Sequence, residues 1–482
     1  DRSWRVPKTM IKLSVVSPST YESPRAMTLS RIFQRVLNDD LNSFVYDASL
    51  AGCNYRISCA PTGYKLSVSG YSEKIPFLLD TLTSRMLEIV KELREGKDRH
   101  PALFDQFERA KEGLLRETKN YRLDVPYEVA NYNSRLVMED NAWYLDDYVD
   151  LMEGELAERD PLTMEQCANV AEACLAGRLK VSTLCMGNID EQGAKEVLGV
   201  ISRHFIDQSR PLNDSELPKF RSMKLPTKEE AIGIFGSEIA QESIPVKYQE
   251  LAISESEENN AVELTLQAGA EAELGYEGIA ILDLIAHMAY NSAYNQLRTK
   301  EQLGYIVSAF TRKVAGGGWG LSVVVQSSNT SPVTLEQRIE EWLKVFRNEL
   351  EEMDPELIAR EARGVVSQLR EDDTKLSQEV AGAWNEISAT EGYHERLATP
   401  AFDRLDRLAD ELVVSNGSNS EFTSNGNKRK SPVDLKHRLL DFFDATFPAD
   451  VPRRRALSSR VFSRASQQEY EDTLGKAGVL SS

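Results

Sequence analysis

Gln302-Leu303-Gly304-Tyr305 and the run that follows it, Gly320-Leu321-Ser322-Val323-Val324, decide the fold, because both have counterparts in the first half of the chain. The counterparts are Leu50-Ala51-Gly52-Cys53 and Lys65-Leu66-Ser67-Val68-Ser69, about 250 residues earlier. Landmarks that recur in the same order at a similar spacing are typical of a duplicated structural unit. The sequence therefore predicts two tandem homologous domains.

The elements around these landmarks repeat as well. Apolar and polar residues alternate over residues 11–15 and again over 262–266, which is the pattern of a half-buried strand. Strands interspersed with helices of moderate length predict the α+β class, each domain being a mainly antiparallel sheet with helices packed on one face. The other expected elements are, in the first half, a helix over 26–50, strands over 53–60 and 64–71, helices from 75, over 101–121, 125–139 and 163–176, a strand over 179–186 and a helix over 191–205, and, in the second half, a helix over 276–298, strands over 304–311 and 320–326, and a helix over 335–350.

Proline and biased composition mark the expected boundaries. Residues 208–227 contain three prolines and no apolar period, so they are predicted to form a linker on the surface. The first domain then comprises residues 1–207 and the second residues 228–482. Within the second domain, residues 415–430 are rich in Ser, Asn and Gly and are expected to form a flexible surface insertion.

Composition and charge exclude several classes of partner. The formal net charge of the 482 residues is -19, so neither nucleic acid nor an anionic membrane surface is an expected partner. Two short basic clusters, at 428–430 and 453–455, are predicted to be solvated. No apolar run approaches the length of about 18 residues that a membrane-spanning helix needs.

No metal site is predicted within this chain. Neither HExxH nor the inverted HxxEH occurs, and the five cysteines contain no CxxC pair. His394-Glu395 begins like HExxH, but Ala398 stands where the second histidine would be needed. The five histidines are too far apart for helical i, i+4 metal pairs; they are His100, His204, His287, His394 and His437.

Residues 294–307 are the best candidate for a site of chemistry. Arg298 is expected at the end of a helix and Tyr305 on the following strand, with Gly304 allowing the backbones of these two elements to approach closely. A guanidinium and a phenol on adjacent elements can both donate hydrogen bonds to one carbonyl oxygen, as the stabilisation of a tetrahedral oxyanion requires. On spacing alone, an arginine that caps a helix and a tyrosine on a strand are more often structural.

The same run resembles the fourth domain of insulin-degrading enzymes and their pitrilysin relatives, which are inverted-zincin metallopeptidases. The resemblance extends in order over nearly the whole chain. The first half resembles the family's third domain. The segments that carry it are Leu50-Ala51-Gly52, Gly70-Tyr71-Ser72-Glu73-Lys74, Ala142-Trp143, Arg298 to Val307, Lys375-Leu376-Ser377 and Trp384-Asn385-Glu386-Ile387.

The resemblance implies a function that this chain completes rather than performs alone. In the family, an N-terminal half carries HxxEH with its zinc, and the two halves close around a peptide substrate. Arg298 and Tyr305 match the catalytic arginine and tyrosine of the C-terminal half, and Tyr294 and Gly304 are assigned to substrate binding. Zinc is therefore expected only in the N-terminal partner half, and this segment is expected to be inactive alone.

Two other readings stay open. The same fold class builds non-catalytic scaffolds, such as partner subunits of processing peptidases and core subunits of respiratory complexes. An unrelated acidic interaction module would require the internal repeat to be a coincidence.

Residues 370–375 read Arg-Glu-Asp-Asp-Thr-Lys, where animal relatives carry a basic cluster that binds polyanions, so regulation by polyanions is in doubt. An intracellular, cytoplasmic location is expected, with an organelle as the alternative, and a homodimer is an additional option.

Overall fold

The computed structural model describes residues 4–217, 219–241, 243–391, 401–414, 431–476 and 478–481. The predicted insertion at 415–430, the basic cluster at 428–430 and His394 lie outside these residues. The chain forms two compact units, which are taken one at a time. Unit 1 comprises Asp1–Asn120, Trp143–Lys219 and Asp373–Gly392, and unit 2 comprises Tyr121–Ala142, Phe220–Asp372 and Tyr393–Ser482.

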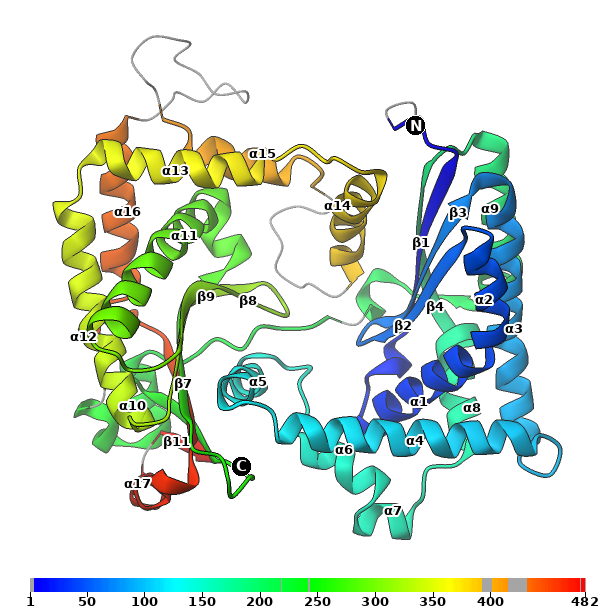
Figure 1. Ribbon diagram of the computed structural model, residues 1–482, viewed down its shortest axis with the longest axis horizontal. Helices are drawn as coiled ribbons and strands as arrows, with labels where there is room; N and C mark the ends of the chain where they lie inside the picture. The colour runs from blue at the N-terminus through cyan, green and yellow to red at the C-terminus, as the bar shows by residue number, and fades with distance from the viewer. Residues whose placement is uncertain are drawn as a thin grey trace. The chain divides into compact units, whose positions relative to one another are not determined.

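Unit 1 is built on a five-stranded sheet in the order β2-β3-β1-β4-β5 (Figure 1). The first four strands pair antiparallel, and the short β5 pairs parallel with β4. The hairpin predicted around residues 61–63 is present, with Gly63 in a φ of 145° that disfavours other residues. The strands are β1 (Lys8–Val16), β2 (Asn54–Ala60), β3 (Gly63–Tyr71), β4 (Arg178–Gly187) and β5 (Arg210–Pro211).

The helices of unit 1 cover one face of this sheet. Ile11, Leu13 and Val15 of β1 are at most 2% exposed and belong to a core that α1, α3 and α8 complete. The predicted helix over 26–50 is two helices that meet near residue 41. The unit 1 helices are α1 (Pro24–Asp40), α2 (Asn42–Leu50), α3 (Ile75–Glu95), α4 (Pro101–Arg122), α6 (Leu145–Met152), α7 (Glu155–Arg159), α8 (Met164–Glu172), α9 (Glu191–Ile201) and α14 (Leu376–Ser388).

Unit 2 repeats the strand order of unit 1. Its sheet runs β11-β6-β10-β7-β9-β8, so the four strands β8-β9-β7-β10 occupy the places of β2-β3-β1-β4. These four strands also pair antiparallel, whereas β6 pairs parallel with both β10 and β11. The order predicted from the internal repeat is therefore present. The strands are β6 (Val246–Leu251), β7 (Asn260–Ala270), β8 (Ile306–Val314), β9 (Gly318–Ser327), β10 (Ala456–Phe462) and β11 (Val479–Ser481).

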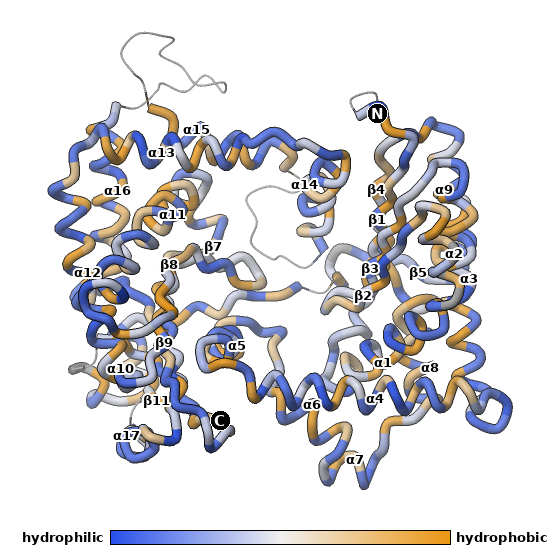
Figure 2. Tube along the Cα trace, in the orientation of Figure 1, coloured by the Kyte–Doolittle hydropathy of each residue, from blue (hydrophilic) through white to orange (hydrophobic). Residues whose placement is uncertain are grey.

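A helical layer again covers one face of the unit 2 sheet. Ser331 caps α12 by accepting from Thr334 N, and Ser431 begins α16 with a capping box. The long helices carry alternating hydrophobic and hydrophilic segments in Figure 2, as expected for one buried and one exposed face. The unit 2 helices are α5 (Pro126–Met138), α10 (Lys228–Phe235), α11 (Glu271–Ala293), α12 (Pro332–Glu352), α13 (Pro355–Leu369), α15 (Arg404–Leu412), α16 (Pro432–Thr446) and α17 (Gln467–Thr473).

Each sheet also receives one helix on its second face. In unit 1 this helix is α14, which contacts β1 and β4; in unit 2 it is α5, which contacts β7 and β10. Helix α14 comes from the second half of the sequence and α5 from the first, so the two halves exchange one helix each. The predicted domain bounds, 1–207 and 228–482, did not include this exchange. The predicted linker 208–227 divides between the two units at residue 219.

The second-face helices explain polar residues that are buried on the strands. Ser14 of β1 is fully buried, and its hydroxyl donates a hydrogen bond of 2.8 Å to Glu391, which follows α14. Glu263 of β7 is fully buried beside Arg312, beneath α5. Buried polar groups are tolerated when they are paired in this way. Among the described residues, no helix is long and apolar enough to cross a membrane.

The cluster at 453–455 corrects one prediction. These arginines were expected to be solvated, but Arg454 is 3% exposed and pairs with Glu340 at 2.5 Å. Arg455 pairs with Glu230 at 2.7 Å, whereas Arg453 is exposed as expected. A charge run that precedes a buried strand is thus partly structural, because Arg454 and Arg455 anchor the entry into β10.

Candidate functional site

The candidate site lies where α11 ends and β8 begins, within unit 2. Helix α11 continues without a break into a π-helical turn, Tyr294–Lys300, and a short loop then leads to β8. Such π turns widen a helix by one residue and often occur at functional sites. Two backbone hydrogen bonds hold the loop against the turn, from Glu301 N to Gln296 O and from Leu303 N to Leu297 O, both at 3.0 Å.

Arg298 lies between the rings of two tyrosines. Its guanidinium carbon is 4.6 Å from the ring centroid of Tyr294 and 4.5 Å from that of Tyr305. Arg298 Nη1 also donates a hydrogen bond of 2.6 Å to the Tyr294 hydroxyl. Cation–π contact on two sides restricts the planar guanidinium to one orientation. The structure thus brings three of the four predicted site residues together.

Tyr305 presents its side chain to solvent. It is 78% exposed, although it sits one residue before β8 and is followed by half-buried Ile306 and buried Val307. A large aromatic side chain with this exposure adds little to the folded core. The phenol is therefore available to a ligand in the structure as it stands.

Gly304 allows a close approach, but not the predicted one. A Cβ on Gly304 would lie 1.8 Å from the carbonyl oxygen of Gln326, at the end of β9. The expectation that Gly304 brings helix and strand together is wrong in this detail, because the crowding partner is the neighbouring strand. Gly304 therefore fixes where Tyr305 leaves the sheet, and its assigned role in substrate binding stays a prediction.

An ion pair that the sequence did not point to secures the loop. Glu301 accepts from Arg338 of α12 at 2.7 Å and from Gln296 Nε2 at 2.7 Å. The hydrogen bond from Arg338 is the main cause of a lowered pKa of the Glu301 carboxyl. The loop that carries Tyr305 is thus tied both to the π turn and to the helical layer.

The aromatic stack extends one turn further back along α11. The ring centroid of Tyr290 lies 6.4 Å from that of Tyr294, and Tyr290 is 47% exposed. Tyr290, Tyr294 and Arg298 are spaced at four-residue intervals, so they share one face of the helix. That spacing was visible in the sequence and would have added Tyr290 to the predicted site.

No cluster of three or more His, Cys, Asp or Glu side chains among the described residues could hold a metal ion. His287 pairs with Glu361 at 3.4 Å and His204 with Asp80 at 2.7 Å, and each carboxylate also pairs with a neighbouring arginine. The candidate site itself offers a cation and phenols rather than the Cys, His, Asp and Glu side chains that usually bind zinc. Its chemistry is hydrogen-bond donation.

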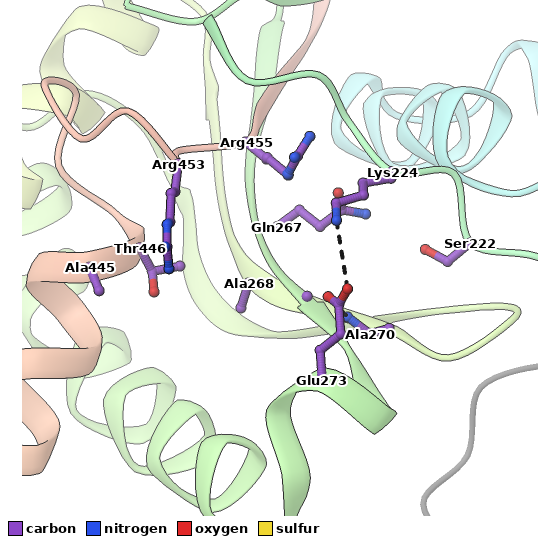
Figure 3. A pocket seen from close by; sticks show the side chains of 11 residues that line it. Ser222, Lys224, Gln267, Ala268, Ala270, Glu273, Ala445, Thr446, Arg453 and Arg455 are labelled. Carbon is purple, nitrogen blue, oxygen red and sulfur yellow. Dashed lines mark hydrogen bonds and ion pairs between the residues drawn. The ribbon is translucent and has the colours of Figure 1, made fainter. Parts of the chain in front are cut away.

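A separate cavity of about 520 Å³ lies at the opposite end of α11 (Figure 3). Lys224 and Glu273 approach to 3.6 Å across it, and Arg453 extends along a neighbouring wall beside Thr446. Glu273 also accepts from the backbone N–H of Ala270, so it caps the start of α11. The lining has three positive charges, Lys224, Arg453 and Arg455, against the one negative charge of Glu273, and Arg455 also pairs with Glu230.

Two family models match the chain. The first, described as the middle or third domain of peptidase M16, matches residues 1–151. The second, described as the C-terminal lobe domain 4 of PQQ synthase PqqF-like proteins, matches residues 284–384 and thus includes the candidate site. The order of the two matches, a third domain before a fourth, agrees with the order of units 1 and 2.

Curated relatives match nearly the whole chain. An insulin-degrading enzyme from Bos taurus is 27% identical over 466 residues, which cover 96% of this chain and 39% of that protein. A putative zinc protease from Schizosaccharomyces pombe is 27% identical over 428 residues, covering 88% of this chain and 39% of that protein. The chain thus spans about two fifths of the length of these relatives.

The fold is shared with a solved peptidase. The crystal structure of pitrilysin aligns with a TM-score of 0.71 and 18% identity, covering 99% of this chain and 43% of that one. At this identity the alignment shows the fold alone.

Proposed function

We propose, from the premise that this chain is the C-terminal half of a protein of the insulin-degrading enzyme and pitrilysin family, that it completes the peptide-binding chamber of a zinc metalloendopeptidase. In this proposal Arg298 and Tyr305 orient the scissile peptide and stabilise its carbonyl oxygen during attack. The observation that carries the proposal is the arginine held between two tyrosine rings, one of which is 78% exposed.

The geometry supports this role because donors are positioned before substrate arrives. A guanidinium has five N–H donors in a fixed plane, and one of those of Arg298 is used by the Tyr294 hydroxyl. The exposed Tyr305 hydroxyl adds a donor on a neighbouring element. Donors that are already oriented stabilise a developing oxyanion more strongly than the neutral carbonyl, which lowers the barrier of the chemical step.

Activation of water is assigned to the N-terminal half of the protein. When bound there, zinc would polarise the scissile carbonyl and generate the attacking hydroxide. This chain contributes neither HExxH nor HxxEH. Its own residues bind and orient the peptide, and peptide hydrolysis needs both halves.

A non-catalytic scaffold is the competing function, since the fold alone does not specify activity. The positioned Arg298 and the exposed Tyr305 favour the catalytic role, because a scaffold gains no stability from an aromatic side chain left in solvent. The two functions differ in what they predict for substitutions at these positions.

The decisive experiment measures turnover of the full-length protein with Arg298→Ala and Tyr305→Phe. Loss of one oxyanion donor typically reduces kcat about 100- to 1000-fold, so we expect a reduction of this order with a smaller change in KM. Tyr305→Phe is the sharper variant, because it removes only the hydroxyl and keeps the ring that stacks on Arg298.

Arg116→Ala is a matched control, since it removes an exposed arginine from α4 in unit 1. Its turnover should equal that of the parent. If both site variants fold and keep the parental kcat, neither side chain has a catalytic role and the scaffold reading is favoured. The isolated chain, dialysed and tested in parallel, should retain no stoichiometric zinc and cleave no peptide.

A further inference from the structure

A second cavity lies on the face of α11 that leads to the candidate site. Asp283, His287 and Tyr290 line it, and Tyr294 and Arg298 continue the same stripe at intervals of three or four residues. The cavity has a volume of about 580 Å³. It lies entirely within unit 2, between α11, β8 and α13.

The walls are largely apolar, and the floor carries an acid. Ala286, Ala309, Phe310, Val365 and Leu369 supply the apolar lining. Asp283 lies on α11 beside β8, where Thr311 Oγ1 donates a hydrogen bond of 2.8 Å to its Oδ1. The cavity therefore suits a side chain that is apolar along its length and polar or charged at its tip.

Among the described residues, Asp283 forms no salt bridge. Thr311 is the single hydrogen-bond donor to it in the part of the chain that the structure describes, and burial raises the pKa of its carboxyl. Two cations, Arg404 and Lys313, lower the pKa of this carboxyl electrostatically, but each has another partner. Arg404 pairs with Glu271, and Lys313 lies 5.1 Å from the ring centroid of Trp319. A half-buried carboxylate in this state gains from an incoming ammonium or guanidinium.

We propose that this cavity binds a lysine or arginine side chain of the peptide substrate. The methylene stem would pack on the apolar walls while the charged tip reaches Asp283, in the way that long cationic side chains commonly bury their stems. The ring of Tyr290 adds cation–π attraction. His287, which also lines the cavity, pairs with Glu361 at 3.4 Å.

The distance along α11 sets where in the peptide this residue lies. At about 1.5 Å per residue, Tyr290 is about 12 Å and Asp283 about 22 Å from Arg298 along the helix. An extended peptide advances about 3.3 Å per residue. The basic residue should therefore lie about four to seven positions from the scissile bond. This inference rests on the proposed function, because it takes Arg298 as the marker of the scissile bond.

The test compares two series of peptides with the full-length enzyme. In one series a lysine is moved through positions three to eight residues from the cleavage site, and in the other norleucine, its uncharged analogue, replaces it. The parent should cleave the lysine peptide with the higher kcat/KM at one or two adjacent positions, by about 10- to 100-fold, as expected for a charge-assisted hydrogen bond.

Asp283→Asn should reduce that ratio to about 1, whereas Glu356→Gln, which removes an exposed charge from α13, should leave it intact. Tyr290→Ala, at a half-exposed position where folding is not at risk, should lower the ratio several-fold. A lysine-to-norleucine ratio that is unchanged in both cavity variants would overturn the inference.

The outcome is separable from that of the proposed function. Arg298→Ala should lower turnover of the lysine and norleucine peptides equally and leave their ratio unchanged. If Arg298→Ala has no effect while Asp283→Asn abolishes the preference, the cavity is a binding site and the catalytic role of Arg298 is wrong. If Arg298→Ala is inactive while the preference persists in Asp283→Asn, the reverse holds.

Discussion

Units 1 and 2 share the order of four strands but differ in the side chain that they present at the start of the edge strand. The landmarks 50–53 and 302–305 precede corresponding strands, β2 and β8. In unit 2 this position holds Tyr305, which is 78% exposed; in unit 1 it holds Cys53, which is 4% exposed. The same shift in residue number makes Tyr46 of α2 the counterpart of Arg298. Both units therefore keep the duplicated strand order. At these two positions, unit 2 has the hydrogen-bond donors Arg298 and Tyr305, whereas unit 1 has Tyr46 and Cys53.

The glycines at this position show how a common backbone accommodates the difference. Gly52 has a φ of 75°, and a Cβ there would lie 2.9 Å from the side chain of Tyr71. At Gly304 the obstacle is a backbone carbonyl of the neighbouring strand. A side chain can rotate away, whereas a strand carbonyl cannot move without disturbing the sheet. Unit 2 is thus more tightly built exactly where the candidate site begins.

The largest expected effect concerns a buried ion pair that ties the helical layer of unit 2 to its sheet. Arg460 of β10 donates two hydrogen bonds to Glu336 of α12, at 2.8 and 2.7 Å, and both side chains are less than 10% exposed. Glu336→Ala leaves the arginine buried and unpaired. We expect a loss of about 3–5 kcal/mol in the free energy of unfolding, measured by urea denaturation.

A matched substitution in unit 1 sharpens the comparison. Glu117 pairs with Arg35 at the surface, with 66% of its side chain exposed. Glu117→Ala should cost less than about 1 kcal/mol, because exposed ion pairs contribute little. If Glu117→Ala and Glu336→Ala lose the same free energy of unfolding, burial does not determine how much the Arg460–Glu336 pair contributes.

The next effect tests the two glycines directly. Gly304→Ala should destabilise unit 2 by about 3 kcal/mol, because the added methyl overlaps the Gln326 carbonyl. Gly52→Ala should cost about 1–2 kcal/mol, since the strain there is a left-handed φ rather than a clash with backbone. Both values can be read from thermal or urea unfolding.

Gly364→Ala is the control for the chemical change itself. Gly364 lies within α13, and nothing stands within 4 Å of the added Cβ. Alanine should therefore raise stability by about 0.5–1 kcal/mol through the entropy of the unfolded chain. A Gly304→Ala variant as stable as the parent would mean that the end of β9 can shift, and that Tyr305 is less firmly placed than the geometry indicates.

Local pattern predicted most of the elements that surround the site, and failed where burial depends on a distant partner. The helix before Arg298, the hairpin over 306–327 and the spacing of Tyr294 and Arg298 all follow from periodicity within a few turns. Strand β10 was missed because Ser458, Ser459 and Arg460 make it look polar. It is buried on both faces, and Glu336, more than 100 residues away, satisfies its arginine.

The same limit explains the exchanged helices. The pattern of 125–139 predicted a helix but not which sheet it covers, and the helix over 376–388 was not predicted. Each covers the sheet of the other half of the sequence, a pairing that depends on matching surfaces and on no local signal. Likewise the crowding at Gly304 depends on the register between β8 and β9, which brings Ile306 opposite Gln326.

The smallest effect concerns pH and should separate the two units. Glu391 follows α14 in unit 1, is 1% exposed, and accepts from Ser14. Burial raises the pKa of its carboxyl, against the opposing influence of Ser14, Ser182, Lys65 and Lys180. The folded state therefore favours the neutral acid. Stability from this contact is present at low pH and is lost as the pH rises above about 4.5, through the raised folded pKa.

In unit 2, Glu301 has the opposite sign, because Arg338 lowers the pKa of its carboxyl. Its contribution is present above about 4.5 and is lost as the pH falls below that value. Hydrogen exchange should therefore show residues 376–388 opening with rising pH and residues 301–305 opening with falling pH. Glu391→Gln, which keeps the neutral shape, should abolish the first trend and leave the second intact. If residues 376–388 instead open with falling pH in the parent, Glu391 is charged in the folded state. Unit 1 would then hold α14 through a charged Glu391, just as unit 2 holds the loop 301–305 through the ion pair of Glu301 and Arg338.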